Sequence, residues 1–147
     1  MKILVLHGPN LNLFGRREPH IYGTTTLAEI NDKLQAIARE LKLELAVLQS
    51  NHEGALLDFF HQHMDEAAGA IINPGGLTQY SVSLHDCIKS MPFPVIEVHM
   101  SNRHAREPWR SHSIFSAAVK GTVEGFGWRS YTSALRLLAE VIQEKKK

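Results

Sequence analysis

The feature that most constrains this chain is a regular alternation of short apolar segments with longer amphipathic ones. The short segments have the composition of buried β-strands, at residues 3–6, 43–48, 70–72, 94–99 and 119–123. The longer segments repeat apolar residues at helical spacing, at residues 26–41, 55–67, 79–90 and 130–144. Such alternation predicts an α/β fold in three layers, with helices on both faces of a five-stranded parallel sheet. We expect one domain covering residues 1–147.

The composition argues against several classes of partner. A formal net charge of +1 provides no excess of positive charge for binding a nucleic-acid backbone. No apolar run approaches the ~20 residues of a membrane-spanning helix, and the N-terminal segment lacks the features of a signal peptide. Cys87 is the only cysteine, so no internal disulfide can form. We therefore expect a cytoplasmic protein without nucleic-acid or membrane partners, in which Cys87 is a buried thiol.

Polar residues follow four of the predicted strands directly, at residues 7–10, 50–53, 73–75 and 99–102. The carboxyl ends of parallel strands lie at one edge of the sheet, and open α/β sheets bind ligands there. The sequence therefore predicts a functional site at this edge.

Two long polar segments interrupt the alternation. Residues 13–25 contain Gly15 and Gly23, which could act as hinges of a loop. Residues 103–113 (RHAREPWRSHS) carry three arginines and two histidines against a single glutamate. Loops of this length in a small domain are usually functional, and we expect the second one to hold an anion.

Tyr22 lies in the first of these loops, close in sequence to Arg16 and Arg17. A surface tyrosine beside solvated arginines is one interpretation. The other is a catalytic base. A phenol is mostly protonated at neutral pH, so such a base needs adjacent guanidinium charge to favour the phenolate, and these arginines could supply it without a metal.

His99 ends a predicted strand and follows Glu97 by two residues. Because side chains alternate along a strand, both point to the same side, where the carboxylate can orient the imidazole and favour its charged form. A structural histidine is the alternative interpretation. The position at a strand end favours a general acid.

The remaining patterns give little support for a metal or a cofactor. Nine histidines suggest a metal site, yet there is no HExxH motif, no CxxC motif and no pair of histidines at a convincing ligand spacing. The glycine turns at residues 8–9 and 75–76 match neither nucleotide-binding glycine motif. They leave a phosphate or flavin carrier as a rival interpretation, but we expect neither metal nor cofactor.

Taken together, four segments resemble the type II 3-dehydroquinate dehydratases in order and spacing. They are GPNLNLFGRREPHIYGTTTL (residues 8–27), QSNHEG (49–54), INPGGLTQYSVSLHD (72–86) and EVHMSNRHAREPWRSHS (97–113). The resemblance implies a flavodoxin-like fold and anti elimination of water from 3-dehydroquinate, through an enolate, to give 3-dehydroshikimate. This reaction serves both the shikimate pathway of aromatic amino acid biosynthesis and quinate catabolism.

The resemblance also implies catalytic roles for five residues. Tyr22 matches the base, and Arg17 matches the loop arginine that keeps it ionised. Asn10 matches the asparagine that holds an enolate-stabilising water. His99 matches the proton donor to the departing hydroxyl, and Glu97 the carboxylate that orients it.

A substrate-binding set follows from the same resemblance. Asn73 matches a residue that contacts a substrate hydroxyl, and Arg110 one that binds the ring hydroxyls. The backbone amides of Met100 and Ser101 match the carboxylate clamp. Gln79 stands where the family usually has a histidine; a glutamine can donate and accept a hydrogen bond but carries no charge.

The resemblance further implies a homo-oligomer, a dodecamer formed as a tetramer of trimers, in which Asp86 reaches the site of a neighbouring subunit. Gln79 and His7 depart from the family pattern. These departures keep a second interpretation open, in which the chain is a non-catalytic or altered-specificity paralogue that binds a related cyclic hydroxy acid.

Overall fold

The computed structural model describes residues 1–147 and contains one all-parallel sheet with the strand order β2-β1-β3-β4-β5. The strands are β1 (Lys2–His7), β2 (Glu44–Gln49), β3 (Ala67–Asn73), β4 (Val95–His99) and β5 (Gly121–Glu124). The predicted five-stranded parallel α/β fold is confirmed. Strand β3 begins earlier than the apolar run at residues 70–72 indicates, because the small residues at its start also pair with β1.

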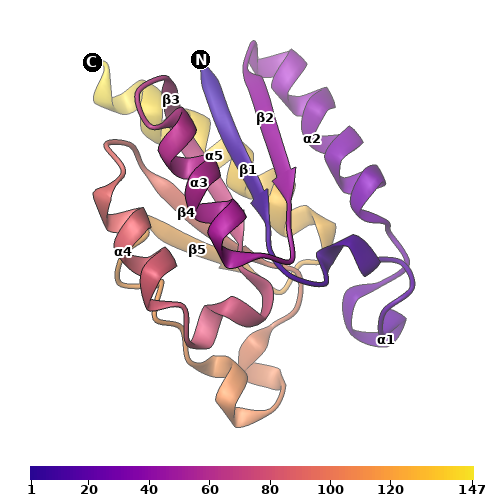
Figure 1. The fold of residues 1–147 in the computed structure, drawn as a ribbon. Coiled ribbons are helices and arrows are strands. Elements are labelled where there is room, and N and C mark those ends of the chain that lie inside the picture. The colour runs from indigo at the N-terminus through magenta and orange to yellow at the C-terminus, as the bar shows by residue number, and fades with distance from the viewer.

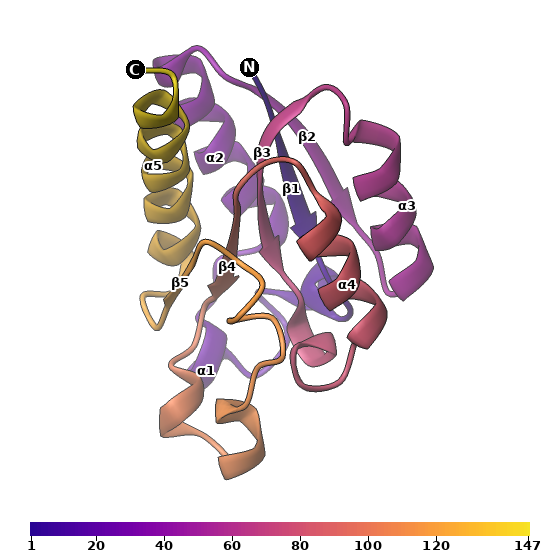
Figure 2. The same cartoon turned by 90° about the vertical axis from the view of Figure 1, so that its left-hand side faces the viewer.

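Four helices cover the sheet, two on each face. Helices α2 (Leu27–Leu41) and α5 (Trp128–Lys145) pack on one face, and α3 (Glu53–His63) and α4 (Val82–Ser90) pack on the other. Figure 1 shows the sheet between these helices, and Figure 2 shows the three layers from the side. None of the helices combines the length and the hydrophobicity that a membrane crossing requires.

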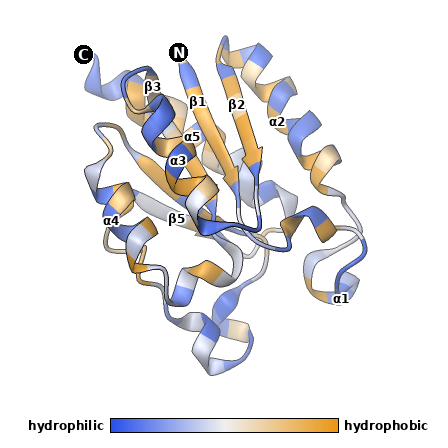
Figure 3. Cartoon of the chain, viewed as in Figure 1, coloured by the Kyte–Doolittle hydropathy of each residue, from blue (hydrophilic) through white to orange (hydrophobic).

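The alternation of side chains along the strands divides the core in two. In β1, Ile3 and Val5 belong to the cluster beneath α2 and α5, whereas Leu4 and Leu6 belong to the cluster beneath α3 and α4. All four are fully buried, as expected for a central strand covered on both faces. Figure 3 shows the hydrophobic strands at the centre and hydrophilic residues along the outer faces of the helices.

Local hydrogen bonds decide where two of the helices begin. Helix α2 begins after a capping box, in which the Thr26 side chain accepts from the Glu29 N–H and the Glu29 side chain accepts from the Thr26 N–H. The helix predicted at residues 79–90 begins only at Val82, which corrects the prediction. Ser81 caps it by accepting from the N–H of Leu84, and the preceding residues Gly75–Gln79 form a separate 3-10 turn.

The strand order places a switch point between β1 and β3, because the chain leaves β1 toward β2 and then crosses back to β3. The backbones that follow these two strands approach closely: a Cβ atom at Gly8 would lie 2.4 Å from the carbonyl oxygen of Pro74. The short helix α1 (Pro19–Tyr22) and the 3-10 turns Arg103–Ala105 and Pro108–Ser111 extend beyond the carboxyl ends of the strands (Figure 1).

Candidate active site

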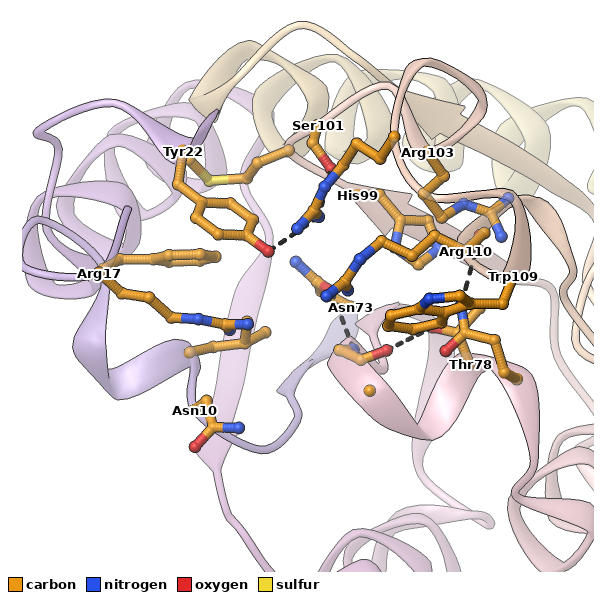
Figure 4. A pocket seen from close by; sticks show the side chains of 17 residues that line it. Asn10, Arg17, Tyr22, Asn73, Thr78, His99, Ser101, Arg103, Trp109 and Arg110 are labelled. Atoms are coloured by element: carbon orange, nitrogen blue, oxygen red, sulfur yellow. Dashed lines mark hydrogen bonds between the residues drawn. The ribbon is translucent and has the colours of Figure 1, made fainter. Parts of the chain in front are cut away.

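A cavity of about 280 Å³ lies at the carboxyl ends of the strands, at the small end of the usual range for ligand sites. Four of its lining residues are arginines, and no aspartate or glutamate lines it. Nine of the site residues predicted from the sequence line this cavity: Asn10, Arg17, Tyr22, Asn73, Gln79, His99, Met100, Ser101 and Arg110. Figure 4 shows most of these side chains around the same space. The charged side chains that line the cavity are thus positive, which suits an anionic ligand.

Tyr22 is the last residue of α1, so the loop at residues 13–25 carries it over the cavity. Its ring packs against the buried Phe14, with the ring centroids 5.7 Å apart. The Cζ atom of Arg17 lies 5.1 Å from the centroid of the Tyr22 ring, over the ring rather than at the hydroxyl. Arg16 is exposed and does not line the cavity.

The cation that contacts the Tyr22 hydroxyl is Arg106, which was not among the residues predicted from the sequence. Its Nη1 donates to the hydroxyl at 2.9 Å and to Ser101 Oγ at 3.2 Å. Its Nε atom is buried without a hydrogen-bond partner. Residues 103–113 were expected to hold an anion, but their composition did not indicate which arginine would reach the tyrosine 84 positions away.

His99 and Glu97 form the pair that strand alternation predicted. The Nε2 atom of His99 lies 2.7 Å from Glu97 Oε2, and both side chains are nearly or fully buried. The second carboxylate oxygen accepts from Ser113 Oγ at 3.0 Å. Because Nε2 is paired, Nδ1 is the ring nitrogen of His99 that remains for a ligand.

The buried guanidinium group of Arg103 lies next to the Glu97 carboxylate of this pair. Arg103 is buried, lines the cavity and places Nη2 3.5 Å from Glu97 Oε2, the oxygen that also contacts His99. Its Nε donates to Glu124 Oε2 at 2.7 Å. A fully buried carboxylate is costly unless it is paired, so Arg103 stabilises Glu97. Glu124, in turn, offsets part of the positive charge of Arg103. Sequence reasoning missed Arg103, because only the fold brings β4, β5 and this turn together.

Asn73 ends β3 and belongs to a buried hydrogen-bond network. Its Oδ1 accepts from the Gly75 N–H at 3.1 Å, and its Nδ2 donates to the Tyr131 hydroxyl at 2.9 Å. The network continues to His7, whose Nδ1 lies 3.1 Å from that hydroxyl and whose Nε2 lies 2.9 Å from Asn31 Oδ1. Burial lowers the pKa of His7 to about 4, although the hydrogen bond with Asn31 opposes this change. Burial likewise raises the pKa of Tyr131.

The other predicted binding groups divide into those that are free and those that already have partners. The backbone N–H groups of Met100 and Ser101 donate to no acceptor within the chain, so both are available to a ligand. Gln79 Nε2 donates to the carbonyl oxygen of Arg110 at 3.3 Å. Arg110 donates from Nε to Glu107 at 2.7 Å and retains its terminal nitrogens for a ligand.

Asn10 adopts a left-handed conformation with φ of 69°, at the turn that follows β1. Its backbone N–H donates to Asn51 Oδ1 at 3.0 Å, and Gln49 Nε2 donates to the Gly8 carbonyl at 3.2 Å. Polar residues at the end of β2 and just after it therefore hold the turn after β1 in place.

Asp86 is the one predicted binding residue that lies away from the cavity. It is on α4, its side chain is 70% exposed, and its only side-chain partner is the neighbouring His85, at 3.0 Å. No three His, Cys, Asp or Glu side chains of the chain are grouped as metal ligands would be.

The fold and the cavity define a class: a small parallel α/β protein with a cationic cavity lined by a tyrosine and a carboxylate-paired histidine. Comparison with known proteins narrows this class. The family described as Dehydroquinase class II matches residues 1–139.

Individual relatives agree over almost their full lengths. The chain is 45% identical over 143 residues to the 3-dehydroquinate dehydratase of Halothermothrix orenii, covering 97% of both chains. It is 50% identical over 135 residues to that of Herpetosiphon aurantiacus, covering 92% of this chain and 94% of the relative. The crystal structure of the type II dehydroquinase from Propionibacterium acnes superimposes with a TM-score of 0.91 at 43% identity, covering 95% of this chain and 96% of that one.

The chain therefore belongs to the class II dehydroquinase family, which confirms the resemblance of its sequence motifs.

Proposed function

We propose that this chain is a 3-dehydroquinate dehydratase in which Tyr22 is the base and His99 is the acid. The observation that carries the proposal is the convergence of both side chains on one small cavity bordered by four arginines and no carboxylate. A cyclic hydroxy-ketone acid supplies the matching anionic group. The names of the relatives supply the reaction, which is a dehydration.

The phenolate of Tyr22 would remove a proton from the carbon beside the ketone. Arg106 donates to the hydroxyl and Arg17 lies over the ring, so two guanidinium groups lie beside the phenol that takes up the proton. The electrons of the broken C–H bond move onto the ketone oxygen, which gives an enolate. A water held near Asn10 would stabilise this negative charge.

The enolate then collapses, and the bond to the hydroxyl on the adjacent carbon breaks. His99 would donate the proton that converts the departing hydroxyl into water. The contact with Glu97 holds the imidazole in place for this step. One proton has moved from His99 to the departing hydroxyl and another from the substrate to Tyr22. Before the next cycle, Tyr22 must lose a proton and His99 must regain one, and the net transfer can pass through solvent.

The substrate carboxylate would bind the free backbone N–H groups of Met100 and Ser101. Asn73, Gln79 and Arg110, which line the same cavity, would contact the ring hydroxyls. A neutral glutamine at this position serves as a hydrogen-bonding group only, so affinity would rest mainly on the arginines.

The proposal extends to assembly and location. We expect a cytoplasmic dodecamer built from trimers, with Asp86 of one subunit reaching the site of another. The exposed Asp86 and the exposed Tyr80 and Val82 beside it support a contact on this face of the subunit. Light scattering of the purified protein tests this: a monomer would refute it.

The direct test is to mix the protein with 3-dehydroquinate and follow the ultraviolet absorbance of the conjugated enone product. We expect turnover that a chelator does not reduce. Tyr22→Phe and His99→Ala should each lower kcat by about 10²- to 10⁴-fold, the usual contribution of a general acid or base. His61→Ala is the matched control for the histidine variant, because His61 is exposed and does not line the cavity.

Two outcomes would count against the proposal. Undiminished turnover by Tyr22→Phe would remove Tyr22 from the role of base. Binding of 3-dehydroquinate by the wild-type protein without turnover would favour the non-catalytic paralogue instead.

A further inference from the structure

The direction of every hydrogen bond in the network beneath the cavity follows from one fixed donor. The backbone N–H of Gly75 can only donate, so the Asn73 atom that faces it, at 3.1 Å, is the carbonyl oxygen. The amide nitrogen of Asn73 therefore faces Tyr131, and it donates to the hydroxyl oxygen at 2.9 Å. The orientation of the Asn73 amide is thus set by the backbone.

The same logic continues to the far side of the network. The Tyr131 hydroxyl has one hydrogen, and its only other partner is His7 Nδ1, at 3.1 Å. His7 Nδ1 must therefore accept, which places the proton of the neutral ring on Nε2. That nitrogen then donates to Asn31 Oδ1 at 2.9 Å. One arrangement of hydrogens satisfies all five groups.

Burial makes this arrangement costly to change. His7 and Tyr131 are fully buried, and Asn73 is only 3% exposed. A reversed bond would leave two donors or two acceptors facing each other without water to relieve them. The ring of His7 also lies against that of Tyr131, with centroids 5.3 Å apart, which limits its rotation.

We propose that His7 and Tyr131 are positioning residues that fix the orientation of the Asn73 amide, so that its Nδ2 donates a hydrogen bond to the ligand. Neither residue lines the cavity, whereas Asn73 does. The carbonyl oxygen of Asn73 is held by the Gly75 N–H and one amide hydrogen is held by Tyr131. The second amide hydrogen of Asn73 is the donor that remains for the ligand. A ligand atom that faces Nδ2 must then be an acceptor, such as a hydroxyl, carbonyl or carboxylate oxygen.

The inference rests on the proposed function only for the identity of the substrate. The network itself is present in the chain without ligand, so its first test uses the wild-type protein alone. Long-range nitrogen–proton correlation spectra of the unliganded protein at neutral pH report which nitrogen of each histidine is protonated. We expect the Nε2–H form for His7. The signals of His7 are assigned as those that are absent from the spectra of His7→Asn. A proton on Nδ1 would overturn the proposal.

Two variants of His7 separate positioning of Asn73 from general support of the fold. An asparagine at position 7 places a carbonyl oxygen where Nδ1 lies, so Tyr131 keeps its acceptor. A glutamine places its amide where Nε2 lies, so the contact with Asn31 is kept and the acceptor for Tyr131 is lost. We expect the KM of His7→Asn to stay within about threefold of wild type. His7→Gln and Tyr131→Phe should each raise KM about tenfold with little change in kcat, because the affected contact is made in ground state and transition state alike.

Equal KM values for His7→Asn, His7→Gln and wild type would refute the positioning role, whatever the stability of the variants. If Tyr131→Phe does not fold, the two His7 variants and the tautomer of His7 in the wild-type protein still test the positioning role. If wild-type protein does not turn over 3-dehydroquinate, the proposed function fails, and the tautomer alone then supports or overturns this inference.

Discussion

The buried histidine at position 7 predicts a specific loss of stability in mild acid. Burial lowers the pKa of His7 in the folded protein to about 4, from an ordinary value of 6.5. As the pH falls from 6.5 toward 4, the unfolded chain takes up a proton at this residue while the folded chain does not. The free energy of unfolding therefore decreases over this range. The contribution of the neutral, buried His7 to the free energy of unfolding is fully present above pH 6.5 and is lost below about 4.

The magnitude follows from the two pKa values. Each tenfold difference in proton affinity is worth about 1.4 kcal/mol, so the full effect of His7 is about 3 kcal/mol. By about pH 5 the loss should already reach about 2 kcal/mol. His7 is fully buried, so solvent does not screen the effect. The carboxylates with lowered pKa values, Glu40, Glu66 and Glu107, lose their contributions only at lower pH, below their ordinary value of 4.5.

Urea unfolding, followed by circular dichroism, measures this loss between about pH 7.5 and about pH 5. The protein concentration is kept constant, because subunit association would couple stability to concentration. His7→Asn is the matched variant, since it is neutral throughout the range. Wild type should lose about 2 kcal/mol more than His7→Asn on this change of pH. Equal losses in the two proteins would refute the argument, and so would a wild-type stability that does not change.

Three further predictions concern other parts of the chain. Arg106→Met removes the hydrogen bond from a charged donor to the Tyr22 hydroxyl, so kcat should fall about tenfold or more; an unchanged kcat in steady-state assays would remove Arg106 from this role. Burial raises the pKa of the Cys87 thiol to about 11, so iodoacetamide should modify it slowly in the folded protein and readily in urea, as mass spectrometry would show; fast modification of the folded protein would contradict this. Thr26→Ala deletes the acceptor for the Glu29 N–H and should lower the free energy of unfolding by about 1 kcal/mol in urea titrations, whereas no loss would show that the cap contributes nothing.

Much of this architecture could be predicted from residue patterns, because the interactions that produce it are local. The period of two along strands and the helical period of 3.6 arise from backbone geometry, so the order of strands and helices was predictable. The contact between Glu97 and His99 belongs to the same kind of information, since two residues of one strand separated by one position point to one side. Motif resemblance completed the predicted site, of which all residues but Glu97 and Asp86 line the cavity.

Contacts between distant segments could not be obtained in this way. The sequence drew attention to Arg16 and Arg17 as the cations near Tyr22, but Arg106, 84 positions away, makes the contact with the hydroxyl. The hydrogen bond between His7 and Tyr131 spans 124 positions and joins the end of β1 to α5. Such pairs depend on how the strands are ordered in the sheet and on how the helices cross it. That arrangement follows from burying the two faces of the whole sheet at once, and no short stretch of sequence contains it.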